Sequence, residues 1–419
     1  MSRSVLRAAP AIGAVLLCWH SASVRAREVS FAELWAYARA HAPPLRVAEA
    51  RTRLADGQRA AASAWFPENP ELELSVGPRF RAGEEGVDFS AALRQPLELN
   101  GGRGSRLRAA ARASERLGVA RELREVEIEL ALEAAYRNAQ LARARLALST
   151  RVAEFSAELR SRVERRLSAG DATLIELRVA EGEAARAASD ALVQQNALQT
   201  ASLALCELSG WPSTDPPLPA AELPALRTAP NLVELSKLAE QRHPELRLHR
   251  AELEQARAEA EVAERAVFPR PALGAELSRE TGPEGPPAWI VLGTLRVSLP
   301  VWQRLEAERG EKNAEQRIAL AELEAFRNTT RVRIASALAE LSGAAQRLQL
   351  LAASGASFDE SLGLLQRGLE AGELPLLEVS FARQRLLDAQ LAALDARADY
   401  ERAWIELERA VGARLGGEP

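Results

Sequence analysis

The chain has 419 residues, and 47% of them are hydrophobic, which is enough for two or three folded domains of ordinary size. Only 5% are aromatic, and alanine and leucine dominate the apolar residues, which favours closely packed helices over a thick globular core. The net charge of −4 and the pI near 5.9 lack the basic character typical of nucleic-acid-binding proteins, so we expect no nucleic-acid partner.

The first 26 residues have the pattern of a secretory signal peptide. Two arginines precede a short apolar run, and the small residues after it end at Ala26, where we predict cleavage. Cys18 lies inside this segment, and because leucine precedes it, a lipid-anchor motif there is weak. Cys206 is then the single cysteine of the mature chain, so no disulfide within the chain is possible.

The first half of the chain predicts a helix, a β-hairpin, a long helix and a returning helix. Apolar and polar side chains alternate along the hairpin strands, and such a period of two is typical of strands with one apolar face. After Asn100-Gly101-Gly102, a long proline-free segment rich in alanine, leucine, glutamate and arginine predicts a very long helix. The predicted elements are a helix over 28–64 with a break at Pro43-Pro44, strands over 71–76 and 87–94 around a turn at 77–86, and helices over 103–167 and 172–208.

Beyond a proline-rich stretch, the same plan repeats at a constant offset of 202 residues. The matching pairs include His41 and His243, Phe66-Pro67 and Phe268-Pro269, Glu176 and Glu378, and Gly210 and Gly412. We therefore divide the chain into a signal peptide at 1–26, a first structural repeat at 27–210, an extended linker at 211–230, a second repeat at 231–412 and a short tail at 413–419.

The second repeat again predicts two strands followed by two helices. Its strands place Leu273, Ala275 and Leu277, and then Trp289 and the alternate residues after it, on one apolar side. A loop at 279–287 joins these strands, a helix is predicted from 303 to 369, a tip at 370–373, and a last helix that ends near 411.

Four strands cannot form a closed structure wide enough for a pore, although each has the apolar face that suits a barrel in lipid. No run of about 18 apolar residues follows the signal peptide, so we expect no transmembrane helix. Isolated hairpins are marginal in water, and we therefore expect the chain to oligomerise, with three copies supplying twelve strands. At about 1.5 Å per residue, the helix over 103–167 would be roughly 100 Å long.

Three sequence segments resemble the outer-membrane efflux proteins of TolC type, over essentially the whole mature chain. They are the strand-to-helix joint at 95–103, which reads QPLELNGGR and is most similar to the heavy-metal (cobalt-zinc-cadmium) branch, and the tips at 168–177 and 370–379. The second joint, at 299–304, departs from that branch. The resemblance implies a mainly α fold with a membrane β-barrel: a homotrimer whose 12-stranded barrel in the outer membrane continues into a long α-helical barrel.

The same resemblance implies a function as the exit duct of a tripartite efflux system in a Gram-negative bacterium. The duct would cross the outer membrane, contact its lipid, extend into the periplasm, and passively conduct substrates, including heavy-metal cations, delivered by an inner-membrane pump of the resistance-nodulation-division type and a membrane-fusion adaptor. The outer-membrane component of a type I protein secretion system is the nearest alternative. A soluble periplasmic coiled-coil scaffold is a more distant one, because its apolar strand faces would need a cover. The partner pump selects the cargo, so the sequence does not reveal it.

The two helical tips are the first candidate sites, since relatives contact the adaptor there and narrow the tunnel. Glu378 matches the position of an acidic constriction residue in relatives, whereas Phe381 replaces their second acid. The alternative is that Glu176 and Glu378 are ordinary solvated charges. The predicted tip residues are Ala169, Gly170, Leu174, Glu176, Ala371, Gly372, Leu376 and Glu378.

The second candidate site is the junction where strand becomes helix. Glycine there supplies backbone freedom, and we expect the junction to lie near the inner edge of the membrane. Its predicted residues are Gly101, Gly102 and Arg103 in the first repeat and Pro300 and Trp302 in the second.

The histidines do not predict a metal site. His41 and His243 are repeat counterparts before a proline, which suits a role at a helix start, and His243 and His249 are six residues apart and do not share a helix face. Without a Cys/His cluster we expect no bound metal. We also find none of the catalytic or phosphate-binding motifs we considered, so we expect neither a cofactor nor enzymatic activity.

Overall fold

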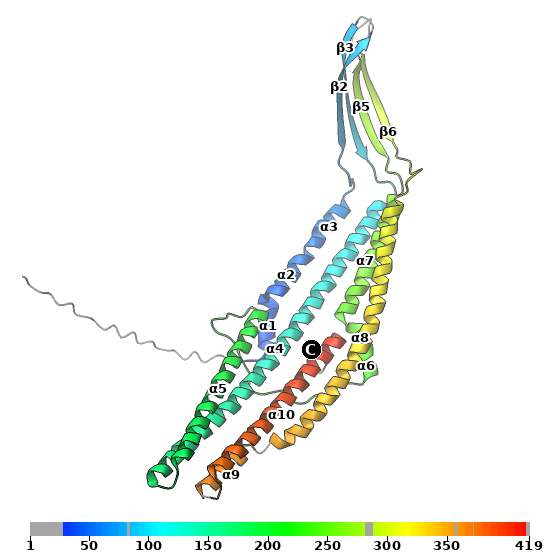
Figure 1. Cartoon of the computed structure of the whole chain (residues 1–419). Helices are drawn as coiled ribbons and strands as arrows, with labels where there is room; N and C mark the ends of the chain where they lie inside the picture. The colour runs from blue at the N-terminus through cyan, green and yellow to red at the C-terminus, as the bar shows by residue number, and fades with distance from the viewer. Residues whose placement is uncertain (1–27, 82–83, 281–287, 356–357, 372, 416–419) are drawn as a thin grey trace, which may run out of the picture.

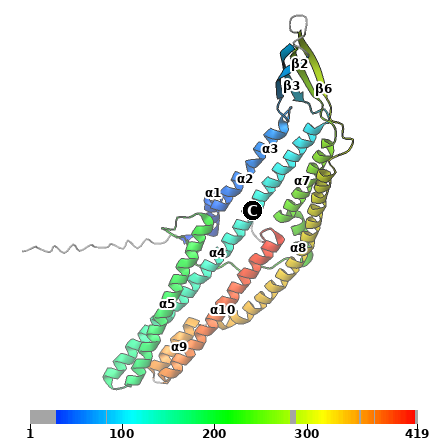
Figure 2. The ribbon, with the colours of Figure 1, turned by 45° about the horizontal axis from the view of Figure 1, so that its top comes forward.

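We analysed a computed structural model, which describes residues 28–81, 84–280, 288–355, 358–371 and 373–415 (Figure 1). A small sheet forms one end of an elongated molecule, and long helices extend from it to two helical tips at the other end (Figures 1 and 2). The structure is thus mainly helical, as predicted. The predicted signal peptide lies outside the described residues. No helix in the described ranges combines the length and the apolar character needed to cross a membrane.

The sheet contains one antiparallel hairpin from each half of the chain. The strand order is β2-β3-β5-β6, and the two hairpins are joined by antiparallel pairing between β3 and β5. The strands are β2 (Glu71–Arg81), β3 (Glu84–Pro96), β5 (Ala272–Glu280) and β6 (Ala288–Arg296). The two predicted hairpins are therefore confirmed.

The first hairpin is longer than predicted, because most of the expected turn at 77–86 is paired strand. Gly77 pairs with Asp88 and Arg79 with Gly86. The Nε atom of Arg79 lies 2.7 Å from a carboxylate oxygen of Asp88, an ion pair across the strands that supports this extension. The glycine-rich composition was misread as a turn, although the alternation of side chains continues through it. Of the predicted loop at 279–287, residues 281–287 lie outside the described part.

One face of the sheet is apolar and uncovered in the single chain. The alternate residues Val76, Phe89 and Leu277 lie on it, and Val76 is 74% exposed. The opposite face carries charges that pair across strands, including an ion pair between Arg94 and Glu73. The predicted separation of apolar and polar faces is confirmed, and a single chain leaves the apolar one without a partner. The apolar face comprises Leu72, Leu74, Val76, Val87, Phe89, Ala91, Leu93, Leu273, Ala275, Leu277, Trp289, Val291 and Leu295.

The first half supplies a long helix pair. The structure confirms the predicted break at Pro43-Pro44, since the chain enters α2 there with a proline at its first helical position. A second break at Arg53 was not predicted, and residues 28–29 are strand rather than helix. The helices are α1 (Phe31–His41), α2 (Pro43–Thr52), α3 (Leu54–Ser63), α4 (Gly102–Ala169) and α5 (Leu174–Ser209).

The second half follows the same order with different helix ends. The helix predicted to start at 303 begins at Glu306. The Glu306 carboxylate accepts a hydrogen bond from the backbone N–H of Arg304, just before the first turn of the helix. That predicted helix is described as two, on either side of residues 356–357. The helices are α6 (Leu232–Arg242), α7 (Pro244–Ala266), α8 (Glu306–Gly355), α9 (Phe358–Glu370) and α10 (Leu376–Val411).

Two tyrosines fix the proline-rich linker across the middle of the bundle. The hydroxyl of Tyr136 on α4 donates to the carbonyl of Val29 and accepts from the N–H of Ala220, and Tyr400 on α10 bonds both backbone groups of Arg227. Sequence reasoning missed the parallel pairing of β1 (Glu28–Val29) with β4 (Leu218–Pro219), because strands of two residues carry no periodic signal.

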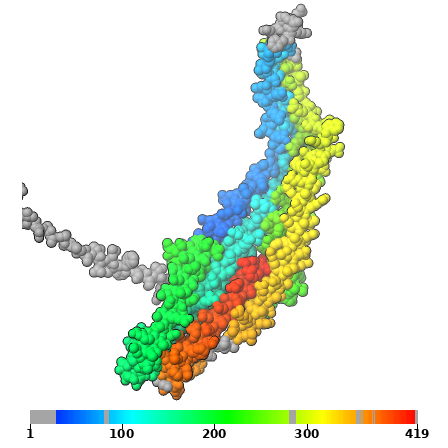
Figure 3. Space-filling view, viewed as in Figure 1, coloured from blue at the N-terminus to red at the C-terminus, as the bar shows by residue number. Residues whose placement is uncertain are grey.

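The helices lie side by side in an elongated body (Figure 3). Several small buried clusters hold them together in place of one thick core. Helix α4 lies along α5 and α7, and α8 lies along α7 and α10. The largest cluster surrounds Trp404 and Tyr400 on α10, and another surrounds Tyr136 on α4. This arrangement explains the alanine-rich, aromatic-poor composition, since close helix contacts leave little room for large side chains.

Candidate functional site: the helical tips and the strand-to-helix junction

The first tip is a self-contained turn. Helix α4 ends at Gly170, whose φ of 88° lies in the left-handed region that glycine adopts without strain. Helix α5 then starts at a capping box: the Glu176 N–H donates to the Thr173 hydroxyl at 3.2 Å, and the Thr173 N–H donates to the Glu176 carboxylate at 2.7 Å. These bonds from Thr173 lower the pKa of Glu176. Glu176 therefore has a structural role that the sequence analysis did not predict.

The second tip lacks this cap. Pro375 precedes α10 and provides no side-chain hydrogen bond, while the Gly368 carbonyl accepts from the N–H groups of Glu373 and Leu374 at 2.9 and 3.1 Å. Glu378 is exposed in the first turn of α10, and within the described residues its carboxylate makes no hydrogen bond or ion pair. Gly372 lies outside the described residues. The two repeat-related glutamates therefore have different surroundings.

The two tips lie side by side (Figure 2). They pack against each other through a shared apolar cluster. Leu376 is 3% exposed in this cluster, whereas its repeat counterpart Leu174 is 59% exposed. Ala169 and Ala371 lie at the exposed turns. The structure thus brings together the predicted tip residues of both halves, with Leu376 inside the contact and Leu174 outside it. The cluster consists of Leu159, Val163, Ala180, Leu369, Leu376 and Val379.

A buried arginine joins the two helix pairs behind the tips. Arg383 on α10 is 4% exposed, and its guanidinium donates to the hydroxyl of Ser156 on α4 and to the carboxylate of Glu183 on α5. Sequence reasoning missed this residue. A signal was present, because Arg383 lies four residues after the buried Val379 and so falls on the apolar side of α10.

The first junction is a hydrogen-bonded turn around two glycines. Gly101 has a φ of 75°, and the Gly102 N–H donates to the side chain of Asn100 at 3.0 Å. The Asn100 amide in turn donates to the Arg265 carbonyl at 2.7 Å, and an ion pair with Arg106 holds the Glu98 side chain, which is 2% exposed. The predicted glycines thus lie within a network that ties the start of α4 to the end of α7.

An exposed tryptophan lies near each junction, Trp65 beside Arg103 and Trp302 in the second half. The guanidinium of Arg103 donates to the Ser63 carbonyl at 3.1 Å and lies 4.2 Å from the ring centre of Trp65. In the second half, Pro300 and Trp302 replace the glycine turn, and Trp302 is 92% exposed. The two halves therefore make the turn from strand to helix by different means.

The two repeat-related histidines lie on opposite sides of a helix boundary: His243 is the N-cap of α7, whereas His41 is the last residue of α1. The His243 ring accepts a hydrogen bond from the Glu245 N–H at 3.2 Å, and burial, aided by the positive charge of Arg333, lowers the pKa of His243 to about 4. His41 contacts the carbonyl of Tyr37 one turn before it. The predicted helix-start role is therefore confirmed for His243 and wrong for His41, whose ring contacts the helix that ends there.

The comparisons with known proteins cover both halves. A sequence model described as outer membrane efflux protein matches residues 34–211 and 235–413. The chain belongs to the outer membrane efflux protein family. The nickel-cobalt-cadmium resistance protein NccC of Alcaligenes xylosoxydans xylosoxydans is 31% identical over 146 residues, which are 34% of this chain and 33% of NccC. The aligned region thus spans about a third of that relative.

Solved channels of the family share the fold over nearly the whole chain. The outer-membrane channel OprN is 20% identical, with a TM-score of 0.73 and coverage of 92% of this chain and 90% of that chain. CusC, described for its folding and transmembrane channel formation, is also 20% identical, with a TM-score of 0.69 and coverage of 92% of both chains. The fold is therefore that of the TolC-like outer membrane channels, and the protein is a channel-family member rather than an enzyme.

Proposed function

We propose that this outer membrane efflux protein is the exit duct of a tripartite efflux system. The observation that carries the proposal is the arrangement of a sheet with one apolar face at one end and two packed helical tips at the other. In this proposal the sheet lies in the outer membrane and the helices extend into the periplasm of a Gram-negative cell. The tips would then lie at the far end of the duct from the membrane, where an adaptor and an inner-membrane pump would meet it.

The proposal requires three copies of the chain. Strands β2 and β6 are the edges of the four-stranded sheet, and their outer hydrogen-bonding groups have no strand partner within the described chain. Unpaired edges cannot remain in lipid, because nothing there satisfies their N–H and C=O groups. Pairing β6 of one copy with β2 of the next would close twelve strands into a ring, and the long helices below would form the tunnel wall.

Heavy-metal cations are the cargo we propose. Support comes from the similarity to the nickel-cobalt-cadmium resistance protein and from the QPLELNGGR joint, which is most similar to the heavy-metal branch. The test is deletion of the gene from its host and measurement of growth on nickel, cobalt and cadmium salts. We expect the deletion strain to be hypersensitive to these metals, and expression of the full chain to restore its tolerance. Unchanged metal tolerance with loss of a secreted protein would favour type I secretion instead.

The duct itself is tested separately, with purified protein in planar lipid bilayers. We expect discrete conductance steps and recovery of the protein from the outer membrane only with detergent. Recovery in the soluble periplasm without detergent would contradict the duct and favour a soluble scaffold.

Adaptor contact at the tips is tested by crosslinking from one introduced, exposed cysteine in each variant, since the native Cys206 is buried. Ile175 and Leu377 are repeat counterparts at the tips and are 75% and 69% exposed, so Ile175→Cys and Leu377→Cys place a reactive group there without disturbing the core. The matched control is Val233→Cys on α6, which is 76% exposed and far from the tips in the chain fold. We expect a crosslinked adaptor from the tip variants alone. Equal crosslinking from Val233→Cys would contradict docking at the tips.

A further inference from the structure

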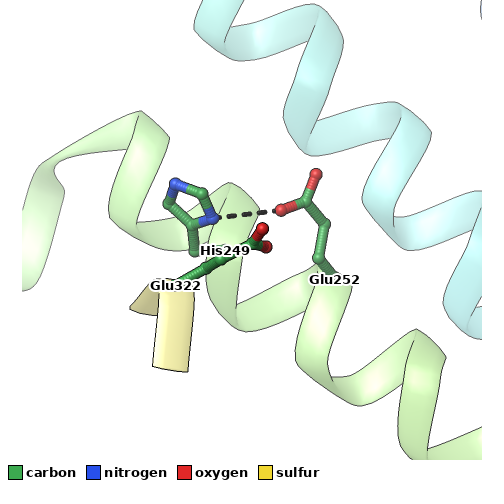
Figure 4. A group of neighbouring side chains, drawn as sticks. All are labelled: His249, Glu252 and Glu322. Atoms are coloured by element: carbon green, nitrogen blue, oxygen red, sulfur yellow. Dashed lines mark ion pairs between the residues drawn. The ribbon is translucent and has the colours of Figure 1, made fainter. Parts of the chain in front are cut away.

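Three potential metal ligands converge where α7 and α8 run side by side, away from the tips and the junctions (Figure 4). His249 and Glu252 come from α7, and Glu322 comes from α8. The Nδ1 atom of His249 lies 3.1 Å from a carboxylate oxygen of Glu252, and the ligand atoms of all three residues lie within 4.8 Å of one another. Their spacing along the chain does not predict a metal site, because Glu322 lies on a different helix from His249 and Glu252 and approaches them only in the folded protein.

The apolar contact between the two helices holds these side chains together. Leu246 and Leu253 of α7 pack against Leu323 of α8 in a small buried cluster. Leu253 follows Glu252 directly, and Leu323 follows Glu322. The ring of Phe326 packs 5.1 Å from the His249 ring, measured between ring centres. The backbone positions of all three ligands are therefore fixed by packing, which leaves only side-chain rotations to complete a site.

The negative charge of the cluster has no arginine partner within the described residues. The two arginines that flank His249 pair elsewhere, Arg247 with Glu122 at 2.8 Å and Arg250 with Glu240 at 2.6 Å.

Among the described residues, the Glu322 carboxylate makes no ion pair or hydrogen bond, and the shielded Nδ1 atom of His249 has no hydrogen bond of good geometry. With a neutral imidazole, the two carboxylates lie close to each other beside His249 without compensation, which favours a divalent cation among the three groups.

We propose that His249, Glu252 and Glu322 bind a first-row divalent cation such as Zn²⁺, Co²⁺ or Ni²⁺ at the contact between α7 and α8. One imidazole nitrogen and carboxylate oxygens form a donor set that suits these cations, whereas Mg²⁺ and Ca²⁺ prefer oxygen ligands alone. Zn–N and Zn–O distances of about 2.0–2.2 Å place neighbouring ligand atoms roughly 3.3 Å apart in a tetrahedral site. The His249–Glu252 pair already has this spacing, and rotation of the exposed Glu322 side chain would bring in the third ligand.

The site goes beyond the proposed duct function and does not depend on it. A bound cation would link α7 to α8 whatever the channel conducts, and equilibrium binding to purified protein is measured without transport. The remaining histidines of the described chain are poor competitors. His243 is 6% exposed, and its ring caps α7, while His41 contacts its own helix.

The test is metal binding by the full-length protein, purified in detergent without a histidine tag. We expect Co²⁺ to give a visible absorption spectrum of a nitrogen- and oxygen-ligated site, and calorimetry with Zn²⁺ to give one site per chain. His249→Ala and Glu322→Gln should each weaken binding by at least about 10- to 100-fold, the loss that follows removal of an outer-shell partner alone. Their matched controls are His41→Ala and Glu324→Gln, the latter on an exposed residue two positions from Glu322.

The result that overturns the proposal is equal binding by wild type, His249→Ala and Glu322→Gln, or no saturable binding by wild type. Because Glu322 is exposed, Glu322→Gln is expected to fold normally and keeps the test valid if the histidine variant does not fold. A protein that binds the cation at this site but gives no conductance would refute the duct and leave the metal site standing.

Discussion

The two tips come from matching positions of a duplicated sequence, yet they are built differently. The first tip is stabilised by its own hydrogen bonds, because Thr173 and Glu176 cap the start of α5, and its Leu174 side chain is exposed. The second tip has no side-chain cap, and α10 instead supplies the contacts between halves, through Leu376 and Arg383. The first tip is thus stabilised by its own cap, whereas the second tip contributes side chains that pack against the first half. Substitutions at matching positions should therefore have unequal effects.

The largest effect is expected from Arg383→Ala. It removes a buried guanidinium and leaves Glu183 and Ser156 without their partner, and breaking an ion pair of this kind costs about 3 kcal/mol where one partner is well buried. We expect a lower midpoint of thermal unfolding, followed by circular dichroism in detergent, and faster proteolysis at the tips.

The control for Arg383 is Arg178→Ala in the first half. Arg178 pairs with Glu181 at the surface, where the two side chains are 71% and 40% exposed, so its loss should cost less than about 1 kcal/mol. Equal destabilisation by the two variants would mean that the bonds from Arg383 to Ser156 and Glu183 do not contribute more stability than a surface ion pair.

The next largest difference in stability is expected between the two strand-to-helix junctions, and Gly102→Ala tests the first of them. A Cβ atom at Gly102 would lie 2.8 Å from the Cδ atom of Glu98, whose side chain is held by Arg106 and cannot easily move. Overpacking of this kind costs about 1–3 kcal/mol. The matched variant is Arg304→Ala at the same repeat position, which we expect to cost much less. Thermal unfolding of both variants measures the difference, and similar midpoints would contradict it.

The cap of the first tip should give a smaller and local effect. Thr173→Ala removes the hydroxyl that accepts from the Glu176 N–H, a loss worth about 1 kcal/mol. We expect faster hydrogen exchange of the first amides of α5, with α10 unchanged. Pro375→Ala at the matching position of the second tip should leave exchange in the first turn of α10 nearly as it was, because no side-chain cap exists there. Equal changes at both tips would refute this difference.

The same cap predicts a dependence on pH. The pKa of Glu176 is lowered in the folded state by its bonds from Thr173, so the stabilisation is present above the ordinary pKa of glutamate and is lost as the pH falls through the lowered value. We expect the protection factors of the first amides of α5, which are corrected for the intrinsic pH dependence of exchange, to fall below about pH 4, and Glu176→Gln to abolish that fall. A fall in protection that persists in Glu176→Gln would assign it to another group.

The sequence alone predicted the repeat, the hairpins, the apolar strand faces and the long helices, because each depends on a period within one segment. It did not predict the role of Arg383 or the meeting of His249 with Glu322, because these depend on which helices become neighbours. The cap of the first tip does have a sequence signal, since Thr173 precedes Glu176 by three residues in the pattern of a capping box. The two-residue strand β4 and the start of α8 at Glu306 were not predicted, because neither produces a periodic pattern of apolar residues.

The smallest expected effect, and the one closest to function, separates the two glutamates. In the proposed duct, Glu378 is exposed and unpaired within the described chain and is available to attract cations, whereas the carboxylate of Glu176 is occupied by Thr173. We expect Glu378→Gln to lower cation selectivity or conductance in single-channel recordings, and Glu176→Gln to change them less. Recording both variants at low and high salt adds a check, because screening should remove the effect of a surface charge. If Glu378→Gln conducts like the wild type at low salt, Glu378 is an ordinary solvated helix charge, and the narrowing of the tunnel must depend on other residues of the second tip, beginning with the exposed Phe381.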